Sequence, residues 1–434
     1  MEFFYLTIVV FLLVLAVFDL FVGVSNDAVN FLNSAIGAKV AKYKTIMIVA
    51  SLGVVIGAVM SAGMMDVARH GIMHPANYSF HEVMTIFLAV MVTDVIVLDM
   101  FNTLGLPTST TVSLVFELLG GTFILALLKM NADGSLEFED LLNSDKALSV
   151  IIAIFVSVAI AFFTGVLVQW LSRIVFTFNY TKKLRYTVAV FGGIAFTILS
   201  YFIFIKGVSK SPFIETGQKE WIQQNTTWLM IAIFVGSTIL MQVLHIFKVN
   251  VFKFIVLMGT FALAMAFAGN DLVNFIGVPM AGLDSYKDFI ANGTGNEDTF
   301  MMESLMTSAK TPFLYLMAAG AIMIIAMATS KKAQNVVKTR VDLARQDEGD
   351  EMFGSSRAAR SLVRASQDLG GFVQHYMPRP VARWIDSRFQ KEEVILEEGA
   401  AFDMVRAAVN LVLASVLIVI GTTFKLPLST TYVT

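Results

Sequence analysis

This 434-residue chain contains ten long apolar stretches, and they restrict its fold more than any other feature. A transmembrane helix needs about 20 mostly apolar residues, and the runs lack the alternation of an outer-membrane barrel. Charged residues make up only 15% of the chain, against about 25% in soluble proteins. We therefore predict an all-α polytopic membrane protein with about 10–12 transmembrane helices. The ten predicted spans are 3–24, 44–65, 84–105, 109–129, 147–172, 185–206, 226–247, 251–268, 313–329 and 404–424.

The charges between the spans predict an orientation in the membrane. Basic connections lie at 39–44, 173–185 and 331–345, and acidic ones at 130–146 and 284–303. Because Lys and Arg concentrate in cytoplasmic connections, counting the spans puts the N-terminus outside and the loop 331–403 in the cytoplasm. We expect a multi-pass protein of the cytoplasmic (inner) membrane. The apolar and aromatic residues of this loop, around Phe372, Tyr376 and Trp384, predict short amphipathic helices near the bilayer surface.

Two motifs occur twice, in the same order. The pattern N-D-x-V-N-F occupies 26–31 and 270–275, and L-P-x-S-T-T occupies 106–111 and 426–431. Seven predicted spans separate the beginnings of the two copies, and because seven is odd, the second copy enters the membrane from the opposite face. Inverted repeats with discontinuous helices or re-entrant hairpins at the midplane are typical of secondary transporters.

The repeat divides the chain into five parts. They are a first inverted repeat (1–130), intervening helices (131–250), the first part of the second repeat (251–330), the loop region (331–403) and the final part of the second repeat (404–434). The first S-T-T is followed by an apolar run at 112–128, whereas the second stands at the end of the sequence. We therefore expect the second repeat to be truncated here.

The N-D motif predicts a cation site. Asp27 and Asp271 lie near membrane depth, where a charge costs about 2.5–3.5 kcal/mol and needs a partner. No Lys or Arg lies well inside a predicted span, so we expect a mobile cation. Asn30 shares a helical face with Asp27, and carboxylate and amide oxygens suit Na⁺, while a carboxylate can also carry H⁺. The alternative is that Asn and Asp cap a helix end.

The L-P-x-S-T-T motif predicts an anion site. Pro107 and the hydroxyl residues after it are typical of a break followed by a new helix start. Such a start presents free N–H groups and the positive end of the helix dipole, and hydroxyls can donate to an oxyanion. The alternative is a Pro-kinked helix whose hydroxyls bond back to their own backbone. Anion and cation sites side by side favour symport.

Three further acids, Asp94, Asp99 and Glu117, lie inside predicted spans. The positions corresponding to Asp94 and Asp99 in the second repeat are Ala414 and Val419, so these acids are not repeated. They form either an extra ion or proton site or a set of hydrogen-bonded structural acids.

The paired motifs resemble those of the inorganic phosphate transporter (PiT) family, which are cation-coupled phosphate symporters. The resemblance covers nearly the whole chain and implies a central phosphate site with Na⁺ or H⁺ beside it. It implies cation binding by Asp27, Asn30, Asp271 and Asn274, with Na⁺ at the two Asp residues, and phosphate binding by Ser109, Thr110, Thr111, Ser429, Thr430, Thr431, Asn26 and Asn270. Val112 and Tyr432 stand where the family often has His, which favours Na⁺ over H⁺.

We therefore predict a secondary active transporter that imports inorganic phosphate with Na⁺ (or H⁺) by alternating access. The alternatives are a symporter of another tetrahedral oxyanion, such as sulfate, and an anion channel. We do not predict an enzyme, because the sequence shows no set of residues typical of a nucleophile and its base. We expect no cofactor beyond the coupling ion. The net charge of −2 gives no reason to expect nucleic acid. The lipid bilayer is the expected environment. The sequence does not decide between a monomer and a homo-oligomer.

Overall fold

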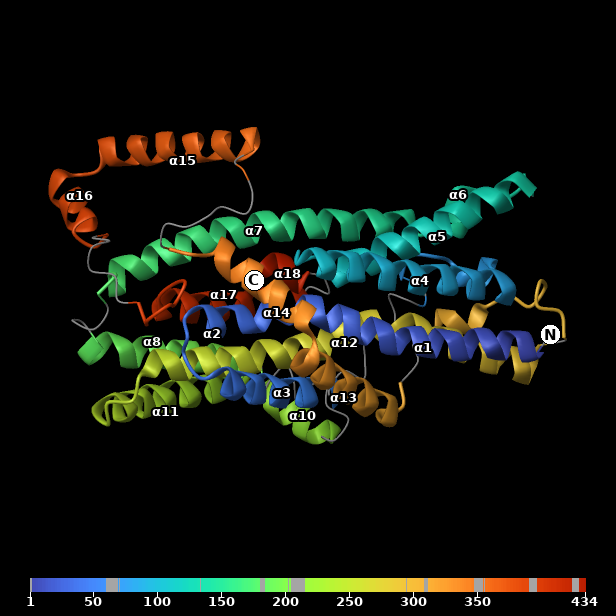
Figure 1. Ribbon diagram of the computed structural model, residues 1–434, viewed down its shortest axis with the longest axis horizontal. Helices are drawn as coiled ribbons and strands as arrows, with labels where there is room; N and C mark the ends of the chain where they lie inside the picture. Colours follow the sequence, from blue (N-terminus) through green and yellow to red (C-terminus); the bar gives the residue numbers. More distant parts are fainter. Residues whose placement is uncertain are drawn as a thin grey trace.

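A computed structural model describes residues 2–59, 69, 71–132, 134–179, 184–201, 203, 215–293, 295–307, 311–346, 354, 356–389, 396–423 and 429–434. Helices dominate this part of the chain, and its only β-structure is two isolated bridges. Most of the long helices run side by side along the longest axis of the molecule (Figure 1). The all-α prediction is confirmed.

Ten helices account for the ten predicted spans. Six are long and apolar enough to cross a membrane, with α2 (Val29–Gly37) continuing the first of them. These six are α1 (Glu2–Asp27), α4 (Phe80–Leu104), α5 (Thr110–Ala132), α7 (Ser144–Phe176), α11 (Thr226–Ile246) and α12 (Val251–Asn292). A seventh candidate is the bent pair of α13 (Phe313–Thr329) and α14 (Lys331–Leu343). The other three are the shorter helices α3 (Tyr43–Val59), α8 (Leu184–Ser200) and α17 (Met404–Thr423).

Helices α1 and α12, which carry the two N-D motifs, lie against each other in opposite directions. A Cβ atom added at Gly23 would lie 2.0 Å from the ring of Phe275, and one added at Gly282 would lie 2.8 Å from Leu12. Residue numbers rise along one helix as they fall along the other, so the pair is antiparallel (Figure 1). This is the arrangement that inverted repeats require.

Helix α12 forms the centre of the molecule. In its most apolar window 72% of the residues are buried, against 11% for α11. Helix α3 packs on it through Gly53 and Gly57, where an added Cβ would lie 2.5 Å and 2.2 Å from carbonyl oxygens of α12. Small residues at such contacts let helices approach closely inside a membrane. The motif in α12 is therefore held between packed helices.

The sequence suggests that the second N-D motif follows the end of a span. The structure shows that it does not. It lies inside α12, which continues from 251 to 292 with Pro279 in its interior. The first copy lies at the junction of α1 and α2, around Ala28. A helix can continue through such polar residues when their side chains find partners on neighbouring helices. The capping alternative therefore does not hold for Asp271.

The loop region contains short helices, as expected. Helices α15 (Arg357–Tyr376) and α16 (Arg379–Asp386) stand apart from the bundle in Figure 1. Phe372, Tyr376 and Trp384 are exposed. The remaining short elements are α6 (Phe138–Leu141), α10 (Thr216–Gln224), α18 (Thr430–Val433) and the 3₁₀ turns η2 (Pro75–Asn77) and η5 (Glu303–Met306). That α15 and α16 lie at a bilayer surface stays a prediction.

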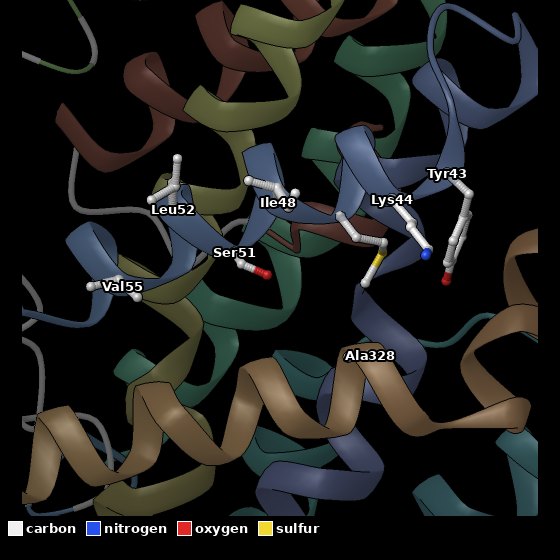
Figure 2. Close-up of a pocket in the computed structure, with 8 residues that line it drawn as sticks. Tyr43, Lys44, Ile48, Ser51, Leu52, Val55 and Ala328 are labelled. Carbon is white, nitrogen blue, oxygen red and sulfur yellow. The ribbon is translucent and has the colours of Figure 1, made fainter.

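An apolar groove runs along the outside of α3. Its lining includes Tyr43, Met47, Leu52 and Val55, with Ala328 of α13 opposite (Figure 2). None of its lining residues belongs to the repeated motifs. This hollow is therefore separate from the polar site described below.

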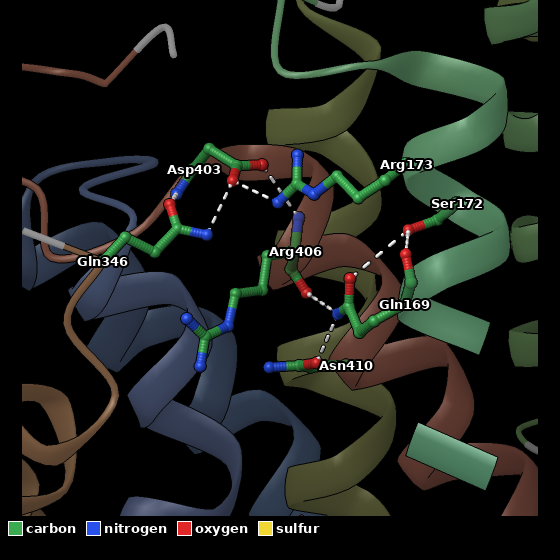
Figure 3. Close-up of polar contacts among 7 residues, drawn as sticks. All are labelled: Gln169, Ser172, Arg173, Gln346, Asp403, Arg406 and Asn410. Atoms are coloured by element: carbon green, nitrogen blue, oxygen red, sulfur yellow. Dashed lines mark hydrogen bonds and ion pairs between the residues drawn. The ribbon is translucent and has the colours of Figure 1, made fainter. Parts of the chain in front are cut away.

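A buried ion pair joins α7 to the start of α17. The guanidinium of Arg173 contacts the carboxylate of Asp403, with side-chain exposures of 7% and 0% (Figure 3). Asp403 also accepts from the Gln346 amide at 3.0 Å and from the backbone N–H of Arg406 at 3.0 Å. These bonds tie the end of the α14 segment to two membrane-associated helices.

We expect Arg173→Met to lower the stability of the protein markedly. The change leaves Asp403 buried without its cation, and breaking such a pair costs about 3–5 kcal/mol. The matched control is Lys253→Met, because the pair Lys253–Glu397 is partly exposed and such pairs contribute about 1 kcal/mol or less. Thermal unfolding in detergent measures both. Equal melting temperatures for the two variants would contradict the assignment.

Candidate functional site

Each S-T-T motif begins a helix. Ser109 Oγ accepts a hydrogen bond from the backbone N–H of Val112 at 3.2 Å, and α5 begins at the next residue. Ser429 Oγ accepts from the N–H of Tyr432 at 3.3 Å, and α18 begins in the same way. Both serines are therefore helix caps, as their type predicts. The preceding residues of the second motif, 426–428, lie outside the described part of the chain.

Asp27 is the point where three of the four motifs meet. Its Oδ2 accepts from Thr110 Oγ1 at 2.6 Å, and its Oδ1 accepts from Thr431 Oγ1 at 3.0 Å. Asn30 donates weakly to the same Oδ1 at 3.4 Å. Thr110 follows Asp27 in the first repeat, whereas Thr431 comes from the far end of the chain.

Asp271 repeats this pattern with the halves exchanged. Its Oδ2 accepts from Thr430 Oγ1 at 3.0 Å, and Thr111 lies close enough to interact with it. Each Asp is thus bonded to the first Thr of its own repeat and lies beside the second Thr of the other. The threonine hydroxyls donate to carboxylates in other helices, so the alternative in which they bond only to their own backbone does not hold.

The second Asn of each N-D motif follows the same rule. Asn30 Nδ2 donates to Thr431 Oγ1 at 3.0 Å and to Thr430 Oγ1 at 3.2 Å. Asn274 Nδ2 donates to Thr111 Oγ1 at 2.9 Å. Each Asn therefore contacts the threonines of the other repeat. Residues that lie about 400 positions apart in sequence form one polar centre.

Asn26 holds the loop that leads into α5. Its Nδ2 donates to Asn102 Oδ1 at 2.8 Å and to the carbonyl of Leu106 at 3.0 Å, and its Oδ1 accepts from the N–H of Thr108 at 2.7 Å. Asn102 is buried and was not predicted, because a single Asn at the end of an apolar run matches no repeated motif. Asn270 is half-buried in α12.

The site combines buried acids with neutral donors. Asp27 is 1% exposed and Asp271 is 3% exposed. Among the described residues, the side chains that bond to them are hydroxyls and an amide, and none is Lys, Arg or His. A buried carboxylate needs a compensating charge. The arrangement therefore suits a small cation at the acids and an oxyanion at the hydroxyls and helix starts.

The remaining predicted acids have different surroundings. Asp99 forms an ion pair with Lys332 of α14 at 2.6 Å, where both side chains are partly exposed. Asp94 and Glu117 instead lie in a buried group with Asp19 of α1. Asp19 was missed, although a single acid between Phe18 and Leu20 in an apolar run is a detectable signal.

Comparison with known proteins agrees with this architecture. A profile of the phosphate transporter family matches residues 23–339. A solved structure described as "The sodium-dependent phosphate transporter" aligns with a TM-score of 0.65 at 17% identity, over 98% of this chain and 87% of that one. No curated protein sequence matches.

The fold and the polar centre define a multi-pass helical membrane transport protein. Because the family profile covers more than half of the sequence, the chain belongs to the phosphate transporter family. The family match includes the first copies of both motifs and the second N-D motif, but ends before the second S-T-T.

Proposed function

We propose that this protein imports inorganic phosphate by symport with Na⁺, through alternating access about the Asp–Thr centre. The reciprocal contacts carry this proposal: Asp27 bonds to Thr431 of the second repeat, and Asn274 bonds to Thr111 of the first. The site therefore straddles two antiparallel halves, which is where secondary transporters bind their substrates.

The chemistry of the centre explains why anion and cation travel together. In this structure the threonine hydroxyls donate to the carboxylates. A Na⁺ ion held by Asp27 and Asp271 would occupy carboxylate oxygens and free these hydroxyls to donate to phosphate. Asn30 and Asn274 can supply amide oxygens to the cation, and we assign Ser109, Ser429 and Asn270 to phosphate binding. Each cargo thereby improves the site for the other.

The choice of Na⁺ rests on the ligands and on the family's fold. The sodium-dependent transporter aligned above shares the fold, and the centre offers the hard oxygen ligands that Na⁺ prefers. Tyr432 and Val112 stand where family members often have His, so neither position supplies an imidazole beside the threonines. H⁺ coupling through the same carboxylates is the second candidate. The N-terminus outside and the loop 331–403 inside follow from the charges of the connections.

Uptake of labelled phosphate into proteoliposomes tests the proposal. We expect accumulation when an inward Na⁺ gradient is imposed, and only equilibration without a gradient. A pH gradient imposed without Na⁺ separates the second candidate, because H⁺ symport would accumulate phosphate under that condition. Uptake that follows neither gradient and does not saturate would indicate a channel and overturn symport.

Competition between unlabelled anions and labelled phosphate tests which anion the protein transports. We expect unlabelled phosphate to inhibit the Na⁺-driven uptake of labelled phosphate at concentrations where sulfate has little effect, because the buried carboxylates accept hydrogen bonds from a protonated phosphate oxygen and sulfate carries no such proton at neutral pH. Arsenate, which is also protonated, is the matched control and should compete. Inhibition by sulfate as strong as that by phosphate would favour a general oxyanion symporter.

A further inference from the structure

A second group of acids lies beside the candidate site, on α1, α4 and α5. Asp19 is 0% exposed and Asp94 is 1% exposed. Hydrogen bonds at both ends of the α1–α4 contact join residues 76 positions apart, which puts Asp19 level with Asp94. The two carboxyl groups are near enough for their charges to interact. Glu117 lies close to both and accepts from Ser113 Oγ at 2.7 Å.

These acids lack the donors that ionised carboxylates need. All four carboxyl oxygens of Asp19 and Asp94, and Oε2 of Glu117, have no hydrogen-bond partner in the described structure. Two facing carboxylates cannot both be ionised in a buried position without a large cost. A single proton resolves this, because the O–H of one carboxyl then donates to the oxygen of the other.

A proton fits this place better than a metal ion. A shared O–H needs only the two carboxyl groups themselves, whereas a metal ion needs further oxygen ligands, and the four carboxyl oxygens have no other partner among the described residues. The pair is also absent from the second half. The position eight residues before Asp271, as Asp19 is before Asp27, is Leu263, and the counterpart of Asp94 is Ala414. The pair is therefore an addition to the two-fold site, not a part of it.

The charge of this pair acts on the candidate cation site. Asp94 and Asp19 are each near enough to Asp27 for their charges to interact with it. Of the other elements packed on α1 and α4, α5 contributes Glu117, α12 brings Asp271 to Asp27, and α13 carries no charged residue. Lys332 of α14 is engaged with Asp99, more than one helical turn from Asp94. A proton bound by either acid of the pair therefore changes the negative charge that acts on Asp27.

We infer that Asp19 and Asp94 form a proton-binding site that controls the affinity for Na⁺ at Asp27. The inference rests on the proposed function, because it assumes Na⁺ at that carboxylate. When the pair holds only its shared proton, its negative charge attracts the cation. A second proton removes that charge, so Na⁺ binds more weakly as pH falls.

Thermal stabilisation by Na⁺, measured without phosphate, tests this coupling. Without phosphate, the ionisation of the anion does not enter the result. The Na⁺ concentration that gives half-maximal stabilisation is determined between pH 5.5 and 8.5. We expect it to rise in the wild type by roughly tenfold towards acid pH, the order expected when one unit charge is removed near a bound cation in a partly screened interior.

The double variant Asp19→Asn/Asp94→Asn mimics the pair that holds both protons, because neither amide can be ionised. We expect weak Na⁺ binding in this variant at every pH, with a smaller pH dependence than in the wild type. Asp19→Leu with Asp94→Ala introduces the residues found at the corresponding positions of the second half, and this second double variant should behave in the same way if the first does not fold. Asp99→Asn is the matched control, because its exposed pair with Lys332 lies outside the acid group, and it should keep the wild-type profile.

The outcomes distinguish a failure of the proposed Na⁺ symport from a failure of the proton-binding pair. If Na⁺ fails to stabilise the wild type at any pH, the proposed function is wrong. If Na⁺ stabilises the wild type and both double variants keep its pH dependence, the proton-binding pair is wrong while the cation site stands. A flattened profile in these variants and not in Asp99→Asn supports the inference.

Discussion

Asp27→Asn and Asp271→Asn are each expected to reduce Na⁺-driven phosphate accumulation to the level of liposomes without protein. The amide keeps the size of the side chain and can still accept from Thr110 or Thr430, so the fold is retained. It removes the negative charge that compensates the cation, and at a buried position that charge is the main source of affinity. Labelled uptake under a Na⁺ gradient measures the loss.

Thermal unfolding and gel filtration establish that these variants are folded. Asp99→Asn is the matched control, because it removes an intramembrane acid that is partly exposed and paired with Lys332. We expect it to transport at close to the wild-type rate. Accumulation at the wild-type rate in both Asp27→Asn and Asp271→Asn would remove these carboxylates from the mechanism.

The sequence was sufficient to predict the parts of this site that depend on repetition. Two copies of N-D-x-V-N-F and two of L-P-x-S-T-T predicted which side chains belong to one polar centre, and the binding roles of these residues stay a proposal. The structure brings Asp27, Asn30 and Asp271 together with threonines of both S-T-T motifs. The predicted helix starts at Thr110 and Thr430 also follow from local chemistry, since Ser before them is a strong cap.

The pairing of individual residues could not be predicted, because it depends on how the helices are placed against each other. Asp27 contacts Thr431 of α18 as well as Thr110 of α5, so this pairing depends on how α18 and α5 are placed against the end of α1. Asn102 and Asp19 were missed for a related reason. Each is a single polar residue in an apolar run, and only its neighbours in three dimensions show what it does.

The continuity of α12 through its motif was also unexpected. From the sequence, Asn270 and Asp271 read as a break, because polar residues after an apolar run usually end a helix. In the fold, Asp271 finds donors on α18 and Asn274 finds an acceptor on α5. Tertiary partners therefore replace the local break, and the site is built on the middle of the most buried helix.

Thr431→Val and Thr111→Val are expected to impair transport to a similar extent. Thr431 bonds to Asp27 and Asn30 of the first repeat, whereas Thr111 bonds to Asn274 of the second and lies beside Asp271. Each valine removes a hydroxyl while keeping the shape of the side chain. A hydrogen bond to a charged group contributes about 1.5–3 kcal/mol, and each 1.36 kcal/mol is a factor of ten. We expect uptake efficiency, kcat/KM for phosphate, to fall by about 10- to 150-fold in each variant.

Serine and valine substitutions separate hydrogen bonding from packing at these positions. Thr431→Ser and Thr111→Ser keep the hydroxyl and should recover most of the efficiency. Thr260→Val is the matched control, because Thr260 is fully buried in α12 and its hydroxyl has no partner in the described structure, so its uptake should stay near wild type. Since the reciprocal contacts make the two crossing threonines equivalent, a large loss in Thr431→Val with none in Thr111→Val would show that only one half of the centre handles phosphate.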